Sequence, residues 1–534
     1  MLNTPQGFGG MVTAPHHLAA QSGLSVLRDG GNAIEAAVAA AATIAVVYPH
    51  MNALGGDNFW LIHEAGSGDG PAPRAISGCG TAGAGVTPDF YRSQGLDQIP
   101  LRGPMAVNTV AGAVGGWQKA LEISAHWGGA LPLSRLLEDA ILYAAEGMPM
   151  TASQVADTLG KLEELREQPG FASTFLPEGR GPTTGTRLRQ PSLAATLQQL
   201  VYAGFDDFYR GDLSRLIAED FDTVGSPLYL EDLTSYQAEE VAPLSVEVKG
   251  GRLFNHPPPT QGLASLILLA LYNKRTAWEA ESFDFYHAMV EATKQAFQVR
   301  DTEIADPGAM TKDPASFLEE ASLARMATAM HATKAAPWPA KNARKGDTIW
   351  LGVVDGEGRA VSLIQSVFWE FGSGVVLPQS GLLWQNRGAS FTLKEGDLNA
   401  VAPGKKPIHT LNPALCLFED GRVMPYGCMG GEGQPQTQAA VFARYALHDI
   451  ELQQAVNAPR WLLGRAWGEE KTGLSLEARV DDKVVAELKK AGHQVELVGE
   501  FDSLMGHAGA LVRHPDGLIE GAADPRSDGC VAAY

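Results

Sequence analysis

The chain has 534 residues, of which 45 % are hydrophobic and 19 % are charged, so it can bury a large core and is not disordered overall. Its formal net charge is −20, which argues against nucleic acid and anionic membrane surfaces as partners. Any small anionic substrate must therefore be held by local positive groups, against the field of the whole chain.

Cysteine and histidine usage gives no sign of a metal or a disulfide framework. The four cysteines are Cys79, Cys416, Cys428 and Cys530. They show no Cys-x-x-Cys spacing, and the 13 histidines lack the spacing of metal ligands, so we expect no metal and no cofactor. Residues 1–10 lack the basic and apolar segments of a signal peptide, and the longest apolar run, residues 36–49, is too short to span a bilayer. We expect a cytoplasmic protein without membrane contact.

The first 300 residues are predicted to be mostly helical. A strand at Met11–Val12 precedes a helix that ends at Gly30-Gly31-Asn32, where glycine suits a helix C-terminus. An alanine-rich helix follows over residues 32–47, and the glycine-bearing loop 51–60 then leads into a strand. From about residue 110 to residue 300 the pattern is mostly helical. The clearest helical periods there are residues 133–147 and 283–303.

From residue 348 onward the pattern favours strands. Residues 348–368 predict a β-hairpin, because two apolar, β-branched runs flank a turn at residues 355–358. The later strands are apolar on both faces, as expected of sheets packed between another sheet and helices, and the helices lie largely before residue 330. We therefore predict one interleaved α/β unit with sheets between helical layers.

Thr348 lies at the junction of two unlike segments. Residues 331–347 are polar and aperiodic and end in Gly346-Asp347, whereas the predicted hairpin begins at once with Thr348. A loose linker followed by a threonine that opens a core strand is the layout of a self-cleaving N-terminal-nucleophile hydrolase. An interdomain linker that enters a strand has the same pattern, so the choice depends on the rest of the chain.

Six segments carry a resemblance that runs in order over nearly the whole chain. They are residues 10–41, 48–60, 346–376, 405–421, 427–436 and 521–529. Together they resemble the γ-glutamyltransferase family of N-terminal-nucleophile hydrolases. The resemblance implies a four-layer αββα sandwich, made as an inactive zymogen that cuts itself between Asp347 and Thr348. The products would be a large chain, 1–347, and a small chain, 348–534, which together form one domain.

The expected chemistry needs a base and an oxyanion site. Cleavage would give Thr348 a free α-amine, which titrates near ~8 and can activate the hydroxyl of the same residue. By resemblance, the backbone amides around Gly430-Gly431 stabilise the oxyanion, although a tight strand-to-helix turn would also place two glycines there. Ser366 falls where the family carries a second hydroxyl near the amine, or is an ordinary strand serine.

The positions that read the substrate depart from the family. The family holds an α-carboxylate with an arginine and an α-amine with an asparagine and an aspartate. Aligned by flanking motifs, these positions become Cys79, Phe368 and Ser390, and a supporting serine pair becomes His409-Thr410. Without a counter-charge, the site is expected to bind an ammonium group poorly.

The basic and aromatic residues that remain near these positions favour a substrate with a small carboxylate. Arg387 and His409 are the basic candidates, and an arginine can hold a carboxylate through two parallel hydrogen bonds. Arg387 could equally be a surface salt-bridge residue. An aromatic group indicates a small, dry pocket or simply core: Trp350, Phe368, Trp369 and Trp384. The predicted substrate-binding residues are Arg387, His409, Thr410, Asn386 and Phe368.

An amidase with a carboxylate site and no ammonium site resembles the oxamate amidohydrolase branch of the family, which splits oxamate into oxalate and ammonia in purine catabolism. Residues 346–391 also resemble that branch. The alternatives are a γ-glutamyl hydrolase or transpeptidase, a glutaryl-cephalosporin-type acylase, and a non-catalytic member that stays one chain. The substrate, the acceptor and any homo-oligomer stay open.

Overall fold

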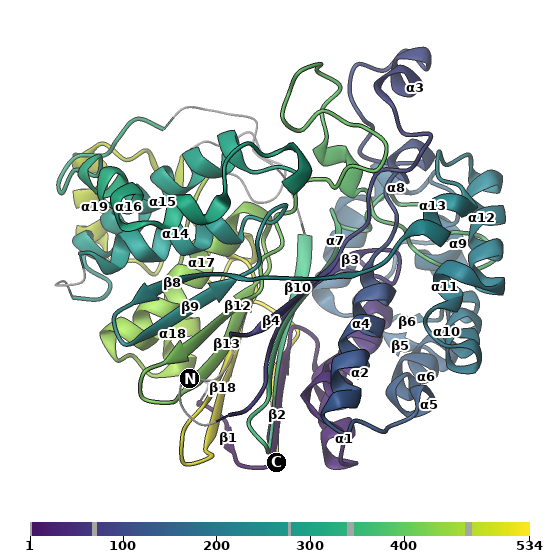
Figure 1. Ribbon diagram of the computed structural model, residues 1–534, viewed down its shortest axis with the longest axis horizontal. Coiled ribbons are helices and arrows are strands. Elements are labelled where there is room, and N and C mark those ends of the chain that lie inside the picture. The colour runs from purple at the N-terminus through teal and green to yellow at the C-terminus, as the bar shows by residue number, and fades with distance from the viewer. Residues whose placement is uncertain (1–2, 67–71, 276–278, 339–346, 465–472) are drawn as a thin grey trace.

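Two seven-stranded sheets stack face to face between layers of helices (Figure 1). This computed structural model describes residues 3–66, 72–275, 279–338, 347–464 and 473–534, with only the backbone of Asp347. The arrangement is the predicted αββα sandwich.

Each large sheet is antiparallel and mixes strands from distant parts of the chain. The first sheet has the order β1 (Gln6–Gly7), β18 (Ile519–Ala523), β17 (Ala508–Arg513), β13 (Val423–Cys428), β12 (Ala414–Phe418), β9 (Gly251–Asn255) and β8 (Leu244–Val248). The second has the order β19 (Cys530–Ala533), β2 (Gly10–Ala14), β10 (Asp347–Asp355), β11 (Ala360–Phe368), β3 (Asp57–His63), β4 (Arg74–Gly78) and β7 (Glu239–Val241). Two small sheets consist of β14 (Trp461–Leu463), β15 (Leu474–Glu477) and β16 (Val495–Val498), and of β5 (Met148–Pro149) and β6 (Arg187–Leu188). Both large sheets contain strands from before and after Thr348, so neither side of Thr348 forms a sandwich alone.

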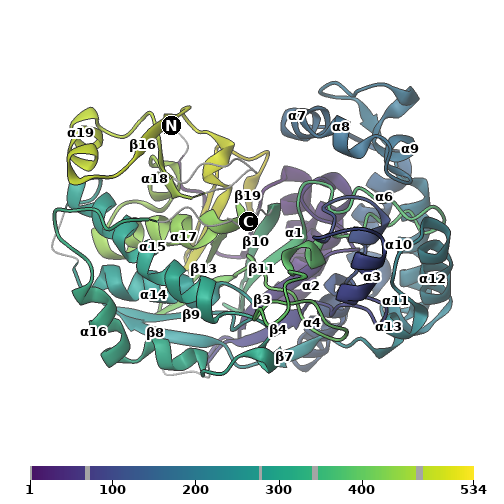
Figure 2. The same cartoon turned by 90° about the horizontal axis from the view of Figure 1, so that it is seen from above.

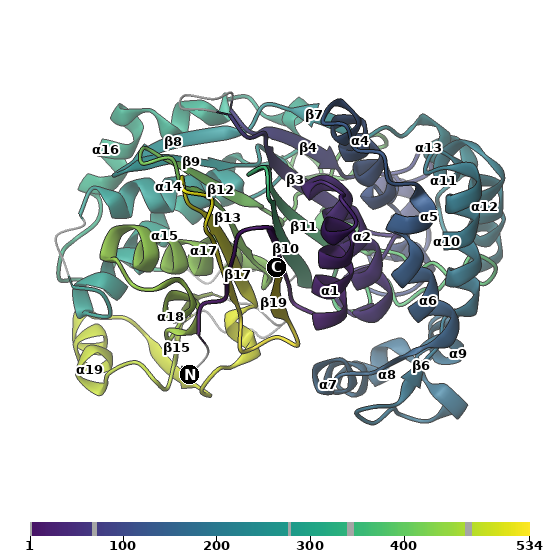
Figure 3. The same ribbon diagram turned by 90° about the horizontal axis from the view of Figure 1, so that it is seen from below.

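Helices cover the outer face of each sheet. The first sheet carries α14 (Gly262–Asn273), α15 (Phe283–Glu303), α17 (Gln434–Phe442) and α18 (Leu452–Asn457), with α16 (Glu320–Thr328) and α19 (Asp482–Ala491) further out. The second sheet carries α1 (His17–Arg28), α2 (Ala33–Val47) and α4 (Ala113–His126) (Figure 3). Every residue of α2 is buried, because its small side chains let neighbouring elements approach closely.

Further helices lie beyond α2, and α7 to α9 project at one corner of the molecule (Figure 2). They are α5 (Leu133–Leu136), α6 (Glu138–Glu146), α7 (Ala152–Gly160), α8 (Leu162–Leu165), α9 (Phe171–Phe175), α10 (Pro191–Ala203), α11 (Asp207–Arg210), α12 (Asp212–Val224) and α13 (Leu230–Ser235), with α3 (Pro88–Ser93) above them. Short helical turns are η1 (Pro104–Ala106), η2 (Pro177–Gly179), η3 (Pro307–Ala309), η4 (Pro314–Leu318), η5 (Arg387–Ser390), η6 (Gly431–Gly433), η7 (Ala443–Leu447) and η8 (Ser503–Met505).

The two sheets pack on each other through Trp350. A Cβ atom added at Gly427 of β13 would lie 2.1 Å from the Trp350 ring, and one at Gly509 of β17 would lie 2.6 Å from it. Both positions must therefore lack a side chain. The indole donates from Nε1 to the Ser362 hydroxyl at 2.9 Å, which satisfies the polar atom of this buried ring.

Most predicted elements are confirmed, with two differences. The hairpin is β10 and β11, and the period over 283–303 is α15. Residues 239–255, expected to lie in a mostly helical region, form β7, β8 and β9 instead. Strand β8 forms the edge of the first sheet and β9 lies next to it, and the LSVEV run of β8 alternates in polarity as a strand with one solvated face does. The period over 133–147 is broken into α5 and α6.

Candidate active site

A row of buried polar residues crosses the second sheet at one end of the space between the sheets. Ser366 of β11 pairs directly with Asp57 of β3. On the other side, Thr348 lies where the register of β10 and β11 shifts, opposite the segment that ends in Phe368. Side chains alternate along strands, so these three lie on the inner face that Trp350 also occupies. All three are fully buried, and strands ~4.8 Å apart put them within ~10 Å of one another.

The facing sheet contributes a glycine loop to the same end. Strand β13 ends at Cys428, and Gly430 and Gly431 follow with φ of +117° and +53°, a region that favours glycine. The next helix begins at Gln434, whose Nε2 donates to Thr348 Oγ1 at 3.4 Å. The hydrogen bonds of the described residues include none donated by the amides of Gly430 or Gly431. The glycine loop therefore leads directly into the residue that contacts the threonine hydroxyl.

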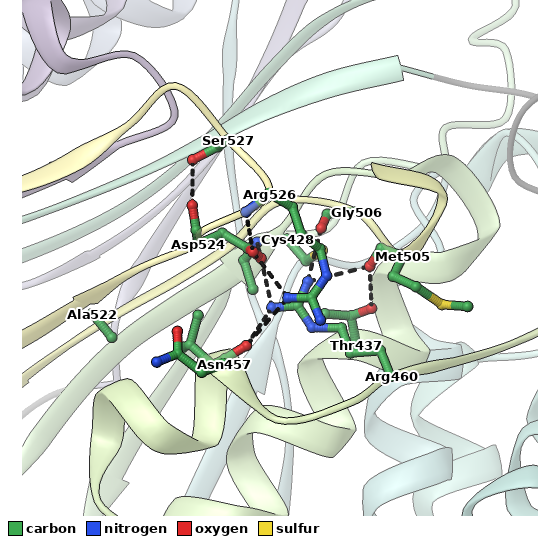
Figure 4. A network of polar contacts seen from close by, with 12 residues as sticks. Cys428, Thr437, Asn457, Arg460, Met505, Gly506, Ala522, Asp524, Arg526 and Ser527 are labelled. Atoms are coloured by element: carbon green, nitrogen blue, oxygen red, sulfur yellow. Dashed lines mark hydrogen bonds and ion pairs between the residues drawn. The ribbon is translucent and has the colours of Figure 1, made fainter. Parts of the chain in front are cut away.

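A buried ion network holds Gly506, a neighbour of that loop (Figure 4). Arg460 donates to the Gly506 carbonyl at 2.8 Å and pairs with Asp524 at 2.5 Å, and Asp524 also pairs with Arg526 at 3.0 Å. Burial would raise the pKa of Asp524, but the two arginines outweigh it and lower that pKa to about 2. Gly506 in turn lies against Gly430, where an added Cβ would meet the Gly506 Cα at 3.2 Å. The network fixes the conformation of the glycine loop.

Arg387 is fully buried, and its guanidinium has no hydrogen-bond partner in the part of the chain that the structure describes. Its Nε and both terminal nitrogens have no hydrogen-bond acceptor among the described residues. The guanidinium lies over the Phe368 ring, with Cζ 4.1 Å from the ring centroid. Burial lowers the pKa of Arg387 to about 9, and nearby Asp57 opposes that shift. A buried guanidinium with all its donors unused is suited to receive an anionic ligand.

Asp57 and His409 face this arginine. The Asp57 oxygen Oδ1 accepts from the amides of Gly80 and Gly112, at 3.3 and 3.0 Å, and from Gln385 Nε2 at 3.1 Å. The other oxygen, Oδ2, has no donor in the described part of the chain and lies 3.5 Å from His409 Nε2. Burial raises the pKa of Asp57 to about 7 and lowers that of His409 well below its usual value.

Asp57 did not emerge from the sequence, and its presence corrects the expectation of a site without an acidic group. Its loop, residues 51–60, reads as an ordinary glycine-bearing entry to a strand. The feature of the sequence that could have indicated it is an aspartate directly after two glycines and before an apolar strand. A carboxylate buried at such a place needs a hydrogen-bonding or charged partner.

The other predicted residues fall into two groups. Phe368, with φ of +83°, is in the site beneath Arg387, and its amide donates to Ser366 Oγ at 2.7 Å. Thr410 is buried beside His409, and its hydroxyl has no partner among the described residues. Asn386 instead accepts from the Trp369 amide at 3.2 Å and donates to the Leu101 carbonyl at 2.8 Å. Both ends of its side chain are therefore committed to holding loops.

Cys79 and the aromatic group are mostly structural. Burial raises the pKa of the Cys79 thiol to about 12, and its sulfur contacts Ser77 Oγ at 3.3 Å, so it is not a thiolate nucleophile. Trp384 packs against Phe208 and Phe221 of the helical layer, and Trp350 lies between the sheets. For these two tryptophans the contacts favour the alternative that they are core residues.

One group of side chains has the composition of a metal site. His287, Glu291 and His493 place ligand atoms within 4.8 Å of one another in the described residues. Glu291 already pairs with Lys294 at 2.7 Å and accepts from the Ala336 amide, while His287 bonds His493 at 2.8 Å. The lysine ammonium supplies the positive charge that a metal would bring. We interpret the group as an ion-paired anchor for residues 331–336.

The comparisons with known proteins agree with this architecture. The family model for gamma-glutamyltranspeptidase matches residues 19–534. The oxamate amidohydrolase proenzyme of Klebsiella pneumoniae is 52 % identical over 98 % of both chains, and the glutathione hydrolase-like YwrD proenzyme of Bacillus subtilis is 40 % identical over 97 % of both. The crystal structure of cephalosporin acylase from Bacillus halodurans matches with a TM-score of 0.90 and 32 % identity, over 100 % of this chain and 97 % of that one.

Stacked antiparallel sheets between helical layers, matched along their whole length to a solved acylase, define the class of N-terminal-nucleophile hydrolases. The chain belongs to the γ-glutamyltranspeptidase family and is an enzyme that acts on amides. Among the helices that the structure describes, none combines the length and apolar character needed to cross a membrane.

Proposed function

We propose that the chain cleaves itself between Asp347 and Thr348 and then uses Thr348 as the nucleophile of an amidohydrolase. The observation that carries this proposal is the place of Thr348, buried at the start of β10 with its hydroxyl beside the glycine loop. Cleavage would give a chain of 347 residues and, from 534 − 347, one of 187. Both similar relatives named above are called proenzymes, which supports a processed precursor.

After cleavage, the Thr348 α-amine would act as the base for its own hydroxyl. The hydroxyl attacks the amide carbonyl, the amides of Gly430 and Gly431 stabilise the oxyanion, and the amine leaves with a proton. Water then splits the ester. Ser366 lies on the neighbouring strand opposite the shifted register, where it would hold the α-amine in place.

The glycine loop gives a direct test of the oxyanion site. We expect Gly430→Ala to lower kcat by ~10²–10³-fold, because a side chain is strained at φ +117° and would push the loop amides away from the oxyanion. Gly204→Ala is the matched control, since its φ of +87° is also unfavourable but no atom lies within 4 Å of the added Cβ. Steady-state rates and melting temperatures of both variants separate backbone strain from catalysis. Unchanged kcat in Gly430→Ala would contradict the assignment.

The best-supported substrate is oxamate, which would give oxalate and ammonia. Arg387 would hold the carboxylate through its unused donors, and Thr348 would attack the adjacent amide carbon. The relative at 52 % identity is an oxamate amidohydrolase proenzyme, which supports this choice. Following the resemblance, we place the reaction in purine catabolism. The four free cysteines suit the reducing cytoplasm.

Asp57 favours one second candidate, a γ-glutamyl hydrolase or transpeptidase. A carboxylate in the site could pair with the ammonium group of an amino acid while Arg387 holds its carboxylate. The test compares ammonia release from oxamate with cleavage of γ-glutamyl-p-nitroanilide, with and without glycylglycine as acceptor. We expect turnover of oxamate alone. Activity confined to the γ-glutamyl substrate would replace the proposal with this candidate, and activity confined to a glutaryl amide would indicate an acylase.

A further inference from the structure

Asp57, Arg387 and His409 form a buried group with unused hydrogen-bonding capacity. All three are fully buried, yet Asp57 Oδ2, both ring nitrogens of His409 and all three nitrogens of Arg387 lack hydrogen-bond partners in the described residues. Buried polar atoms are nearly always paired. Unpaired atoms from three elements that converge on one point indicate that a polar ligand completes the set.

The charges of this group restrict which ligand can enter. Arg387 and an ionised Asp57 cancel each other, and His409 is neutral because burial lowers its pKa well below 6.5. Binding a carboxylate to Arg387 would leave one uncompensated negative charge in a fully desolvated site, which is costly. A proton on Asp57 removes that charge.

The other ionisable groups that face Asp57 do not take up the compensating proton. Burial raises the pKa of the Cys79 thiol and of the Tyr209 and Tyr236 phenols, so these three are neutral. Lys406, whose charge acts on both Cys79 and His409, pairs with Glu239 at 2.5 Å. Burial already raises the pKa of Asp57 to about 7. Among these groups Asp57 therefore accepts a proton most readily.

We propose that Asp57 takes up one proton from solvent when a substrate carboxylate binds to Arg387, which makes Asp57 a specificity-determining residue for substrates with a single negative charge. The proton resides on Oδ2, which can then donate towards the neutral Nε2 of His409, 3.5 Å away. The inference rests on the proposed function, because it needs Arg387 to hold the substrate carboxylate.

The pH dependence of KM follows from this exchange. Below pH 7 Asp57 is protonated before binding, so KM for oxamate should be constant. Above the Asp57 pKa of about 7, each binding event must draw a proton from solution, and KM should rise ~10-fold per pH unit. Asp57→Asn keeps an Oδ1 acceptor but has no proton to gain. Its KM should stay flat up to pH 8, where Arg387 keeps its charge, and lie ~10-fold below that of the wild type at that pH.

The experiment measures KM for oxamate from pH 5.5 to 8 on the processed enzyme, for wild type, Asp57→Asn and His409→Gln. KM is read separately from kcat, which carries the ionisation of the Thr348 amine. Titration calorimetry with pyruvate, a monoanion of oxamate's size without an amide, is run at pH 8 in two buffers of different ionisation enthalpy. We expect uptake of close to one proton in wild type and His409→Gln, and none in Asp57→Asn.

The outcomes separate the inference from the function. Oxamate hydrolysis with a pH-independent KM, or pyruvate binding without proton uptake, overturns the role of Asp57 and leaves the function standing. Pyruvate binding with proton uptake in an enzyme inactive on oxamate supports Asp57 and removes oxamate as substrate. No pyruvate binding removes the Arg387 anion site and the inference with it. If Asp57→Asn does not fold, the wild-type calorimetry still decides. An amino-acid substrate would instead make Asp57→Asn raise KM at every pH.

Discussion

Thr348→Ala is expected to leave the protein as a single chain of 534 residues and to lower amidase activity by more than ~10⁴-fold. In the wild type, the hydroxyl attacks the Asp347 carbonyl to form an ester as the peptide nitrogen leaves, and water splits the ester. Alanine removes the attacking oxygen from both this reaction and the later amide hydrolysis. Intact mass under denaturing conditions and ammonia release measure the two losses separately.

Thr348→Ser is the matched control, because it keeps the hydroxyl and removes only the methyl group. It should still process into chains of 347 and 187 residues, more slowly, because a serine rotamer is less restricted. Thr348→Ala must retain the wild-type melting behaviour for the comparison to hold. A wild-type chain that stays whole after long incubation, or an alanine variant that still divides at Asp347, would refute the proposed nucleophile.

Periodicity and segment order predict much of the fold from the sequence. The hairpin of β10 and β11 and the 21-residue helix α15 have strong periods, and they lie where expected. Strands β8 and β9 were missed because five-residue strands carry too little pattern to stand out within a helical region. The position of β9 is decided by pairing with β12, more than 150 residues later in the chain, and β8 pairs with β9.

The site residues also divide into those that the sequence could predict and those that it could not. Thr348 and the Gly430-Gly431 pair could be found because their roles follow from local motifs. Asp57 could not, since its significance depends on the burial of Arg387, which is remote in sequence and reaches Asp57 only through the fold. The same limit applies to Trp384, which lies in the apolar run 382–384 next to the site but points into the helical layer.

Arg387→Met is expected to lower kcat/KM for oxamate by ~10²–10³-fold, mainly through KM, and to make the protein more stable. The activity falls because the substrate carboxylate loses its bidentate partner. The stability rises because the wild type holds a guanidinium with no hydrogen-bond partner among the described residues, and methionine fills a similar space without the buried charge. At pH 6, where Asp57 is protonated, we expect a gain of about 1–3 kcal/mol.

Arg444→Met is the matched control for burial of an arginine. Arg444 is also fully buried, but it forms two hydrogen bonds with Glu281, at 2.6 and 3.0 Å, and one with the Pro459 carbonyl at 2.7 Å. Its replacement should lower the melting temperature and leave kcat/KM per folded molecule unchanged. Arg387→Lys should retain part of the affinity, since a lysine supplies the charge without the planar pair of donors. If Arg387→Met lowers the melting temperature as Arg444→Met does and leaves kcat/KM for oxamate unchanged, Arg387 is a structural residue. An arginine kept for a ligand weakens the fold instead, so its removal should raise the melting temperature.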